Sequence, residues 1–328
     1  MAWNRLALAL FVMAALLLLA VLVSLTPSDQ WFIRTIDLVR EPMVYIAALL
    51  LVIALVAGTR WRWATGALLT LVIGINVWRI WPYSAFAATQ MTVAEVPFAP
   101  EDPRCFSAMA VNVQVENEQY AKLIAQLDRH DPDLLLLMET DQPWIDALEP
   151  FLSRYGHVDR HPHSDAFGLV FATRLPVRRS AIVENTYRDT PTLYATVQPE
   201  GALAIEFIGL HPKPPLPDWN TEMRDRNIIR AGTRTPDRLP DALAMGDFND
   251  VPWSSTVTKF RDEGDWRDPR VGRGTYATFP AGMGPLGWPL DQLMVKGRLK
   301  LISFDILPDN GSDHRAVLAN LCAPAQLD

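Results

Sequence analysis

Long apolar runs dominate the first part of the chain. Three of them, near residues 6–25, 43–58 and 64–80, are rich in aliphatic residues, and the first has 20 residues without a charge. A run of this length can cross the roughly 30 Å hydrocarbon core of a membrane as an α-helix. Tryptophans stand at the ends of the runs, as in the aromatic belt of a membrane protein (Trp31, Trp61, Trp63, Trp78 and Trp81). The pattern predicts a transmembrane region over residues 1–81 with about three transmembrane helices.

Two other interpretations of these runs fit less well. The first run could be a cleaved signal peptide, but no small-x-small cleavage site precedes Thr26, and further apolar runs follow. The second and third runs could be buried helices of a soluble protein, but they lack the polar face of such helices. Arg5, Arg60 and Arg62 flank the runs, and the positive-inside rule assigns them to the cytoplasm. We therefore expect a multi-pass protein of the inner (plasma) membrane, with residues 82–328 in the periplasm or outside the cell.

A different pattern begins after residues 82–103, which contain four prolines and have the irregular composition of a linker. Short apolar runs now alternate with amphipathic segments. Phe106–Val113 and Leu134–Met138 have the length and composition of buried strands, whereas Glu118–Arg129 has the apolar spacing of a helix. This alternation predicts an α/β domain of packed layers over residues 104–323.

Polar residues recur where the apolar runs of this domain end. Most stand at or just past the C-terminal end of a run, and the last two precede the final run: Asn112, Glu139, His211, Asp247, Asn249, Asp313 and His314. The sharpest such end is Gly246-Asp247-Phe248-Asn249, between an apolar run and the turn that contains Pro252. Loops at strand ends commonly carry functional groups, because the sheet fixes the backbone. We expect these residues to gather at one rim of the domain.

Charge is distributed unevenly along the chain. In residues 1–103, six arginines balance six carboxylates, so the formal net charge of -7 falls on residues 104–328. An acidic domain repels a phosphate backbone at long range, although a local basic groove remains compatible with the sequence. The charge therefore disfavours, but does not exclude, a nucleic acid as the partner.

The two cysteines, Cys105 and Cys322, stand at the two ends of the α/β domain. If the first and last strands are neighbours, a disulfide could join them, and it would persist only in an oxidising compartment. Two buried free thiols are an equally good interpretation. The sequence leaves both open.

The polar residues of the expected rim suit metal-assisted chemistry. Glu139, Asp247 and Asp313, together with Asn112 and Asn249, form an all-oxygen set, which hard cations such as Mg²⁺ or Mn²⁺ prefer. Such an ion stabilises charge that develops on phosphoryl oxygens. Imidazoles can transfer protons, and His314 and His211 supply two of them. Asp291 has the residue type that orients an imidazole.

These residues lie in ordered motifs that resemble the endonuclease/exonuclease/phosphatase superfamily. The motifs are Val111-Asn112-Val113, Met138-Glu139-Thr140, His211-Pro212, Gly246-Asp247-Phe248-Asn249, Leu290-Asp291-Gln292 and Ser312-Asp313-His314-Arg315. The resemblance covers roughly residues 105–322 and is greatest to membrane-anchored bacterial members. It implies a four-layer sandwich in which two mixed β-sheets are flanked by helices.

The resemblance also implies roles for the rim residues. Glu139 would be the main metal ligand, with Asn112 and Asp313 close to it. Asp247 and Asn249 would bind metal or phosphate and position the attacking water. His314 would be the general base, oriented by Asp291, and His211 would donate a hydrogen bond to the scissile phosphate.

Two features depart from the nuclease members of the superfamily. Many of them have an arginine two residues before the aspartate that corresponds to Asp291, whereas this chain has Pro289. No cluster of Lys or Arg suited to a duplex stands near a motif. Arg224, Arg226 and Arg230 share one expected helix and could touch a phosphate, but a solvated helix face is the favoured interpretation.

The sequence therefore predicts a membrane-tethered, Mg²⁺-dependent or Mn²⁺-dependent hydrolase of phosphoester bonds, either phosphodiesterase or nuclease-like. The alternative is a catalytically silent, membrane-anchored binding or scaffolding domain. The expected substrate is a lipid headgroup, a nucleotide or a nucleic acid. No protein partner follows from the sequence.

Overall fold

The computed structural model describes residues 2–26, 28–58, 60–94, 98–187, 190–215, 217 and 220–326. Its contacts divide the chain into two units. We call Met1–Ala88 with Pro215–Glu222 the helical unit, and Thr89–Pro214 with Met223–Asp328 the sheet unit. Each is described on its own.

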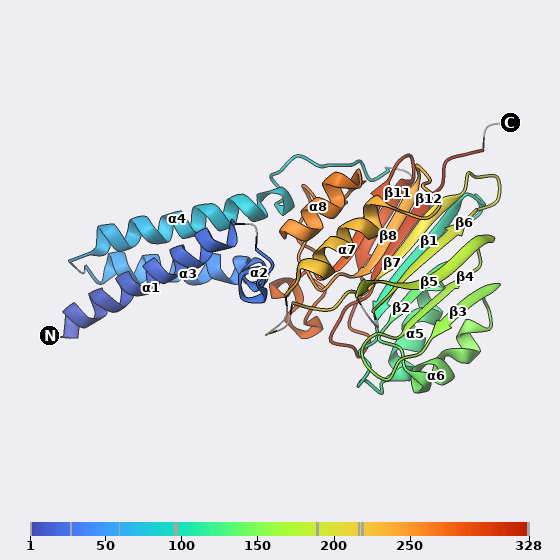
Figure 1. Ribbon diagram of the computed structural model, residues 1–328, viewed down its shortest axis with the longest axis horizontal. Helices are drawn as coiled ribbons and strands as arrows, with labels where there is room; N and C mark the ends of the chain where they lie inside the picture. The colour runs from blue at the N-terminus through green and yellow to red at the C-terminus, as the bar shows by residue number, and fades with distance from the viewer. Residues whose placement is uncertain are drawn as a thin grey trace. The chain divides into compact units, whose positions relative to one another are not determined.

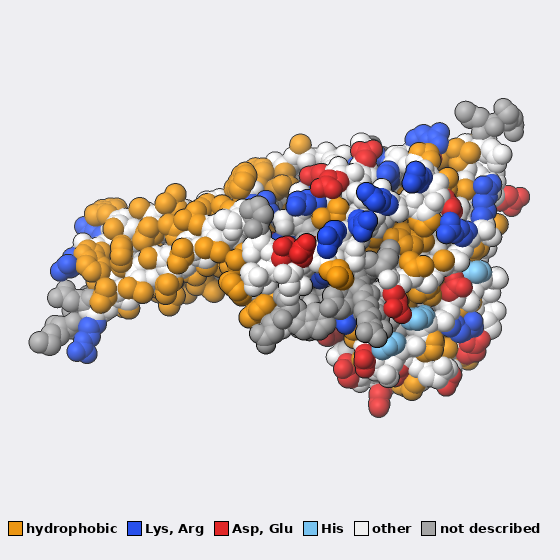
Figure 2. All heavy atoms as spheres, viewed as in Figure 1, with side chains coloured by type: hydrophobic (Ala, Val, Ile, Leu, Met, Phe, Trp, Pro, Cys, Tyr) orange, Lys and Arg blue, Asp and Glu red, His pale blue; other side chains and the backbone are white. Residues whose placement is uncertain are grey.

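The helical unit contains four α-helices among its described residues: α1 (Ala2–Ser24), α2 (Trp31–Leu38), α3 (Arg40–Val56) and α4 (Arg62–Ile80), the last followed by the short 3-10 helix η1 (Trp81–Tyr83). Two segments, Arg5–Ser24 and Arg62–Tyr83, are long and apolar enough to cross a membrane. Helices α2 and α3 pass the same test only together, and they are bent by 71°. The structure thus offers two candidate spans, or three if the bent pair is one span. On the face seen in Figure 2, hydrophobic side chains cover most of this unit.

Helix α2 lies in a segment that the sequence pattern treats as a loop, between the first two apolar runs. Two of the residues that α2 buries, Arg34 and Asp37, are charged. The segment therefore lacks the apolar run that usually marks a buried helix. Asp37 accepts hydrogen bonds from Arg34 (3.2 Å) and from Arg40 (2.7 Å). Arg40 also donates to Asn76 of α4 at 3.1 Å. Paired and hydrogen-bonded charges can be buried between helices, whereas single ones cannot.

Two six-stranded sheets form the sheet unit. The first has the order β11 (Lys300–Ile306), β12 (Val317–Cys322), β1 (Cys105–Asn112), β2 (Leu134–Met138), β4 (Leu169–Thr173), β3 (His157–His161). The second has the order β5 (Val177–Tyr187), β6 (Thr190–Val197), β7 (Ile205–Leu210), β8 (Ala242–Asp247), β10 (Asp291–Lys296), β9 (Trp266–Arg267). Strands β1 and β2 are parallel, as are β7 and β8, and the other paired strands are antiparallel. Both sheets are therefore mixed.

Helices cover the outer face of each sheet (Figure 1). In β1, Ala108 and Ala110 face a core shared by the two sheets, whereas Met109 and Val111 pack with residues of α5 (Tyr120–His130) and α6 (Gln142–Leu152). Residues of α7 (Glu222–Thr233) and α8 (Ser255–Glu263) pack on the second sheet in the same way. Strands covered on both faces must be apolar at every position. The expected four-layer sandwich is confirmed.

The ends of the sheet unit are joined. Strands β1 and β12 are antiparallel neighbours in which Cys105 faces Cys322, and the two form a disulfide across 217 residues of sequence. The sequence left open either a disulfide or two free thiols, and the structure contains the disulfide. A cross-link over so long a loop stabilises the folded state by about 4–5 kcal/mol in the chain-entropy model. The sheet unit also includes residues before β1, and one of these, Met91, is buried in its core.

Candidate active site

Strand direction brings the expected residues to one edge of each sheet. Asn112 ends β1, Glu139 follows the parallel β2, His211 follows β7, and Asp247 ends the parallel β8. Strand β10 is antiparallel to β8, so its first residue, Asp291, faces Asp247. Strand β12 is antiparallel to β1, so the turn before it, with Asp313 and His314, returns to the same edge. The two edges meet, because the backbone N–H of Asp247 lies 3.2 Å from the sulfur of Met138.

Asn112 joins carboxylates from the two sheets. Its Nδ2 donates to Glu139 Oε1 at 2.8 Å and to Asp247 Oδ2 at 3.1 Å. Its Oδ1 accepts a hydrogen bond from the backbone N–H of Gln114 at 3.0 Å, which fixes the orientation of the amide. Here the amide nitrogen, rather than the oxygen that would ligate a metal, faces the carboxylates. One buried amide thus sets the spacing of two acids that come from different sheets.

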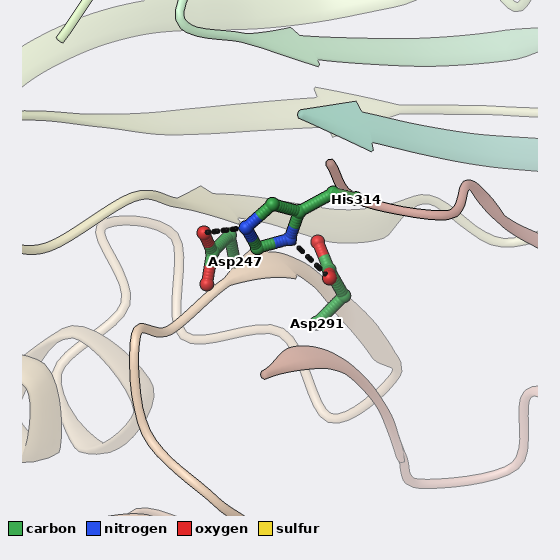
Figure 3. Close-up of side chains that lie close together, drawn as sticks. All are labelled: Asp247, Asp291 and His314. Atoms are coloured by element: carbon green, nitrogen blue, oxygen red, sulfur yellow. Dashed lines mark hydrogen bonds and ion pairs between the residues drawn. The ribbon is translucent and has the colours of Figure 1, made fainter. Parts of the chain in front are cut away.

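The imidazole of His314 lies between two buried carboxylates (Figure 3). Its Nδ1 is 2.8 Å from Asp291 Oδ2, and its Nε2 is 3.6 Å from Asp247 Oδ2. Burial disfavours the charged imidazole, but the charges of Asp291 and Asp247 outweigh this effect and raise the pKa of His314 to about 10. Asp291 is in place to orient the ring.

His211 approaches the same two acids as Asn112. Its Nε2 is 3.7 Å from Glu139 Oε1 and 3.8 Å from Asp247 Oδ2. Its Nδ1 is buried and has no hydrogen-bond partner among the described residues. The ring of Phe167 lies beside it, with the ring centroids 5.8 Å apart. A buried imidazole with an unsatisfied nitrogen is typical of a site that binds a ligand.

Asp313 and Asn249 lie at the margin of this cluster. Burial raises the pKa of the Asp313 carboxyl group; the charge of His314 opposes the rise and that of Asp247 adds to it. The backbone N–H of Asn249 donates to Asp247 Oδ1 at 2.7 Å, and its Nδ2 donates to the carbonyl of Pro212 at 3.0 Å. Asn249 therefore ties the loop after β8 to the loop after β7.

The backbone of the site is strained at two of its residues. Glu139 has a φ of 62° and Asn249 a φ of 49°, in the left-handed region that non-glycine residues seldom adopt. Gly246 has a φ of 140°, and a Cβ atom there would lie 2.0 Å from the carbonyl oxygen of Leu210. Only glycine fits that position, which explains the first residue of the Gly246–Asn249 motif. Such strain is common where side chains are held for function.

Arg224 corrects one interpretation of the sequence. It is buried rather than on a solvated helix face, with only 3% of its surface exposed. Its guanidinium donates to the carbonyls of Phe248 at 3.0 Å and Asn249 at 3.2 Å. The solvated interpretation is wrong for this residue, which instead supports the loop after β8. Helical spacing gave no sign of this contact, because it depends on tertiary packing.

The sequence also gave no sign of two residues behind Asp291. Thr278 Oγ1 accepts a hydrogen bond from the backbone N–H of Asp291 at 3.2 Å. Arg270, fully buried in an ion pair with Asp268, donates to the carbonyl of Asp291 at 3.3 Å. Both contacts join segments that are distant in sequence, and no sequence motif predicts them. They fix the backbone from which Asp291 reaches His314.

The cluster has the chemistry of a cation site. Ligand atoms of Asp247, Asp291 and His314 lie within 4.8 Å of one another, and all three residues are buried. Glu139 and Asp313 add further carboxylates beside them. Several buried acids in one place are stable only with positive charge nearby. Carboxylate oxygens favour hard divalent cations, so these residues fit such an ion.

The fold and this site define a known class of protein. The chain belongs to the endonuclease/exonuclease/phosphatase family, whose model matches residues 109–314. The family comprises hydrolases of phosphoester bonds, nucleases and phosphatases among them. No curated protein matches the chain.

Solved structures with the same fold share little sequence with it. D. rerio TDP2 complexed with a single-strand DNA product is 14% identical, with a TM-score of 0.54, and the match covers 66% of this chain and 98% of TDP2. The human Nocturnin catalytic domain is 16% identical, with a TM-score of 0.52, over 66% of this chain and 94% of the domain. A mannosyl-6-phosphatase of Bacteroides thetaiotaomicron is 15% identical, with a TM-score of 0.51, over 66% and 99%. At such identities the likeness establishes the fold alone.

Proposed function

We propose that this protein is a divalent-metal-dependent hydrolase of phosphoester bonds, tethered to a membrane by its helical unit. The observation that carries the proposal is the placement of His314 between Asp291 and Asp247, next to the acids that Asn112 joins. This set combines an oriented proton-transfer group with buried oxygen ligands. A scaffolding domain does not need such a combination, because gathering acids inside a fold costs stability unless positive charge compensates them.

Glu139 and Asp247 are the residues best placed to hold Mg²⁺ or Mn²⁺, with Asp313 beside them. When bound, such an ion supplies positive charge against the charge that develops on the phosphoryl oxygens. Asn112 keeps the two acids at the spacing that their shared hydrogen bonds define. Its part in this proposal is therefore to position ligands.

The imidazoles would carry the proton transfers. Asp291 holds Nδ1 of His314, which leaves Nε2 directed toward Asp247. Nε2 would then be the atom that accepts a proton from the attacking water. His211 offers a buried N–H donor to a phosphate oxygen at the same edge. Neither role requires movement of a strand.

The membrane tether is part of the proposal. The three candidate spans, with the bent pair of α2 and α3 counted as one, and a disulfide, which persists in oxidising compartments, support a multi-pass protein whose sheet unit lies in the periplasm or outside the cell. Protease added to spheroplasts of an expressing bacterium should then degrade the sheet unit. If the sheet unit is fully protected in intact spheroplasts and is degraded only after the membrane is broken, it lies in the cytoplasm and the proposed topology is wrong.

Hydrolysis is tested on the full chain in detergent. With Mn²⁺ or Mg²⁺ present, we expect turnover of bis(p-nitrophenyl) phosphate or p-nitrophenyl phosphate, and loss of turnover when a chelator is added. His314→Ala should lower kcat by at least about a hundredfold without changing the circular dichroism spectrum. Metal binding without turnover of any phosphoester would favour the binding or scaffolding alternative.

A further inference from the structure

The segment that follows Arg270 in the chain forms one wall of the site. The ring of Phe279 lies against the imidazole of His314, with the centroids 4.7 Å apart. The backbone N–H of Ala281 donates to the carbonyl of Asp313 at 2.7 Å. The short helix η2 (Ala281–Leu286) is thereby fastened to the turn that carries His314. The residues of η2 closely follow Phe279, which contacts the imidazole of His314.

This helix presents apolar side chains to solvent. Met283 is 46% exposed and Leu286 is 64% exposed. Among the described residues of the sheet unit, the other large apolar side chains with comparable exposure are Met223 and Val183. Exposed apolar groups that gather beside a site commonly mark contact with an apolar ligand.

Met283 and Leu286 belong to the helix that is fastened to the turn of His314, and we call these two residues the apolar rim. Met223 belongs to α7 instead. Val183, in β5, belongs to a strand at the far edge of the second sheet and has no such attachment.

Charge distinguishes the possible ligands of this rim. The formal charge of -7 lies on residues 104–328, and the site contains the buried carboxylates of Asp247 and Asp291. A polyanionic strand is repelled by such a domain. Other phosphoesters have one charged group and an apolar remainder. Such a molecule can place its charged group at the metal site and its apolar part against the apolar rim. A membrane lipid has this chemistry, and the helical unit carries helices that suit a bilayer.

We propose that the substrate is a membrane phospholipid whose headgroup phosphoester enters the site while its acyl chains contact Met283 and Leu286. The inference rests on the proposed function. Water adds to phosphorus, the bond from phosphorus to the leaving alcohol oxygen breaks, and that oxygen takes a proton. The products are an alcohol and a phosphomonoester, and no oxidant or second substrate is needed.

The test compares a lipid with its own headgroup, using the full chain in detergent with Mn²⁺. Phosphatidylglycerol in mixed micelles should be hydrolysed with a kcat/KM at least about tenfold above that for glycerophosphoglycerol, which lacks the acyl chains. A double variant, Met283→Gln with Leu286→Gln, should lower this preference by about tenfold, mainly through KM. Val183→Gln, a matched change at an exposed apolar residue away from the site, should leave the preference unchanged.

The outcomes separate the two proposals. Turnover of bis(p-nitrophenyl) phosphate without preference for the lipid over its headgroup overturns the lipid inference and leaves the proposed function standing. The lipid inference is also overturned, and the proposed function still stands, if the double variant keeps the full preference for the lipid. Cleavage of a single-stranded DNA oligonucleotide faster than the lipid has the same consequence. Failure to hydrolyse any phosphoester overturns both.

Discussion

Asp247 and Asp291 face each other across the antiparallel pair of β8 and β10, and their carboxylates hold the imidazole of His314 between them. The register of one strand pair thus sets the distance between the acid that we propose binds a metal and the acid that we propose orients His314. A shift of one residue would turn either side chain to the other face of the sheet. The chemistry of the site depends on the same hydrogen bonds that build the sheet.

Replacing Asp291 by asparagine tests the orientation of His314. The variant Asp291→Asn keeps the side-chain shape and removes the charge that holds Nδ1, so kcat should fall by about a hundredfold to ten-thousandfold. The thermal midpoint should also fall, because the variant takes from the buried His314 the carboxylate that pairs with it, so kcat is measured well below that midpoint. Steady-state kinetics on a chromogenic phosphodiester measure the effect, and Asp305→Asn, at an exposed carboxylate of β11, serves as the control. Equal kcat for Asp291→Asn and the wild type would remove Asp291 from the mechanism.

Glu139→Gln tests the metal site without an activity assay. A divalent cation is held mainly by charged oxygens, so Mn²⁺ should bind at least about tenfold more weakly. Titration calorimetry of the full chain with Mn²⁺ measures the change directly. The exposed Glu118, changed to Gln, should leave the affinity unaltered. If both variants bind Mn²⁺ as the wild type does, Glu139 is not a ligand.

The backbone at Gly246 gives a prediction about stability. The Cβ of Gly246→Ala would lie 2.0 Å from the carbonyl oxygen of Leu210, at a φ of 140°. We expect a loss of about 3 kcal/mol or more, with a lower thermal midpoint, because two strands must separate to admit the methyl group. Gly156→Ala is the matched control, since no atom lies within 4 Å of its Cβ position. Similar midpoints for the two variants would contradict the geometry of this turn.

The disulfide gives a prediction that separates stability from activity. Changing Cys105 and Cys322 to serine together should lower the free energy of unfolding by about 4–5 kcal/mol. Turnover well below the thermal midpoint should persist, since the cysteines stand at the end of β1 opposite to Asn112. Denaturant unfolding and kinetics at low temperature measure the two effects. Loss of turnover without loss of stability would tie the bridge to the chemistry.

The sequence predicted the central strands and the edge strand β11, and it missed the other strands at the sheet edges. Strands β1, β2 and β8 are covered on both faces, so each appears in the sequence as a plain apolar run. Strands β3, β5 and β9 are the outermost strands of their sheets and contain charged residues such as Arg160, Arg178 and Arg267. Edge strands are partly solvated, and their composition resembles that of loops. Helix α2 was missed for a related reason, since its charges are paired only after folding.

The positions of the site residues followed from strand ends, but their contacts did not. Asn112 and Glu139 could be assigned to one rim because β1 and β2 end there. The direction of the Asn112 amide depends on Gln114, and the backbone of Asp291 depends on Arg270 and Thr278. Such contacts join residues far apart in the chain. A single sequence contains no pattern that encodes them.

One strand separates the disulfide from the site. Strand β1 begins at the disulfide and ends at Asn112, a distance of about 23 Å at the usual rise of a strand. Strand β12 returns to the disulfide, so the last strand of the sheet unit ends at the edge away from the site. A fluorescent protein or a solid support coupled after residue 326 therefore leaves the opening of the site unobstructed. The same layout lets an immobilised enzyme keep its full access to substrate.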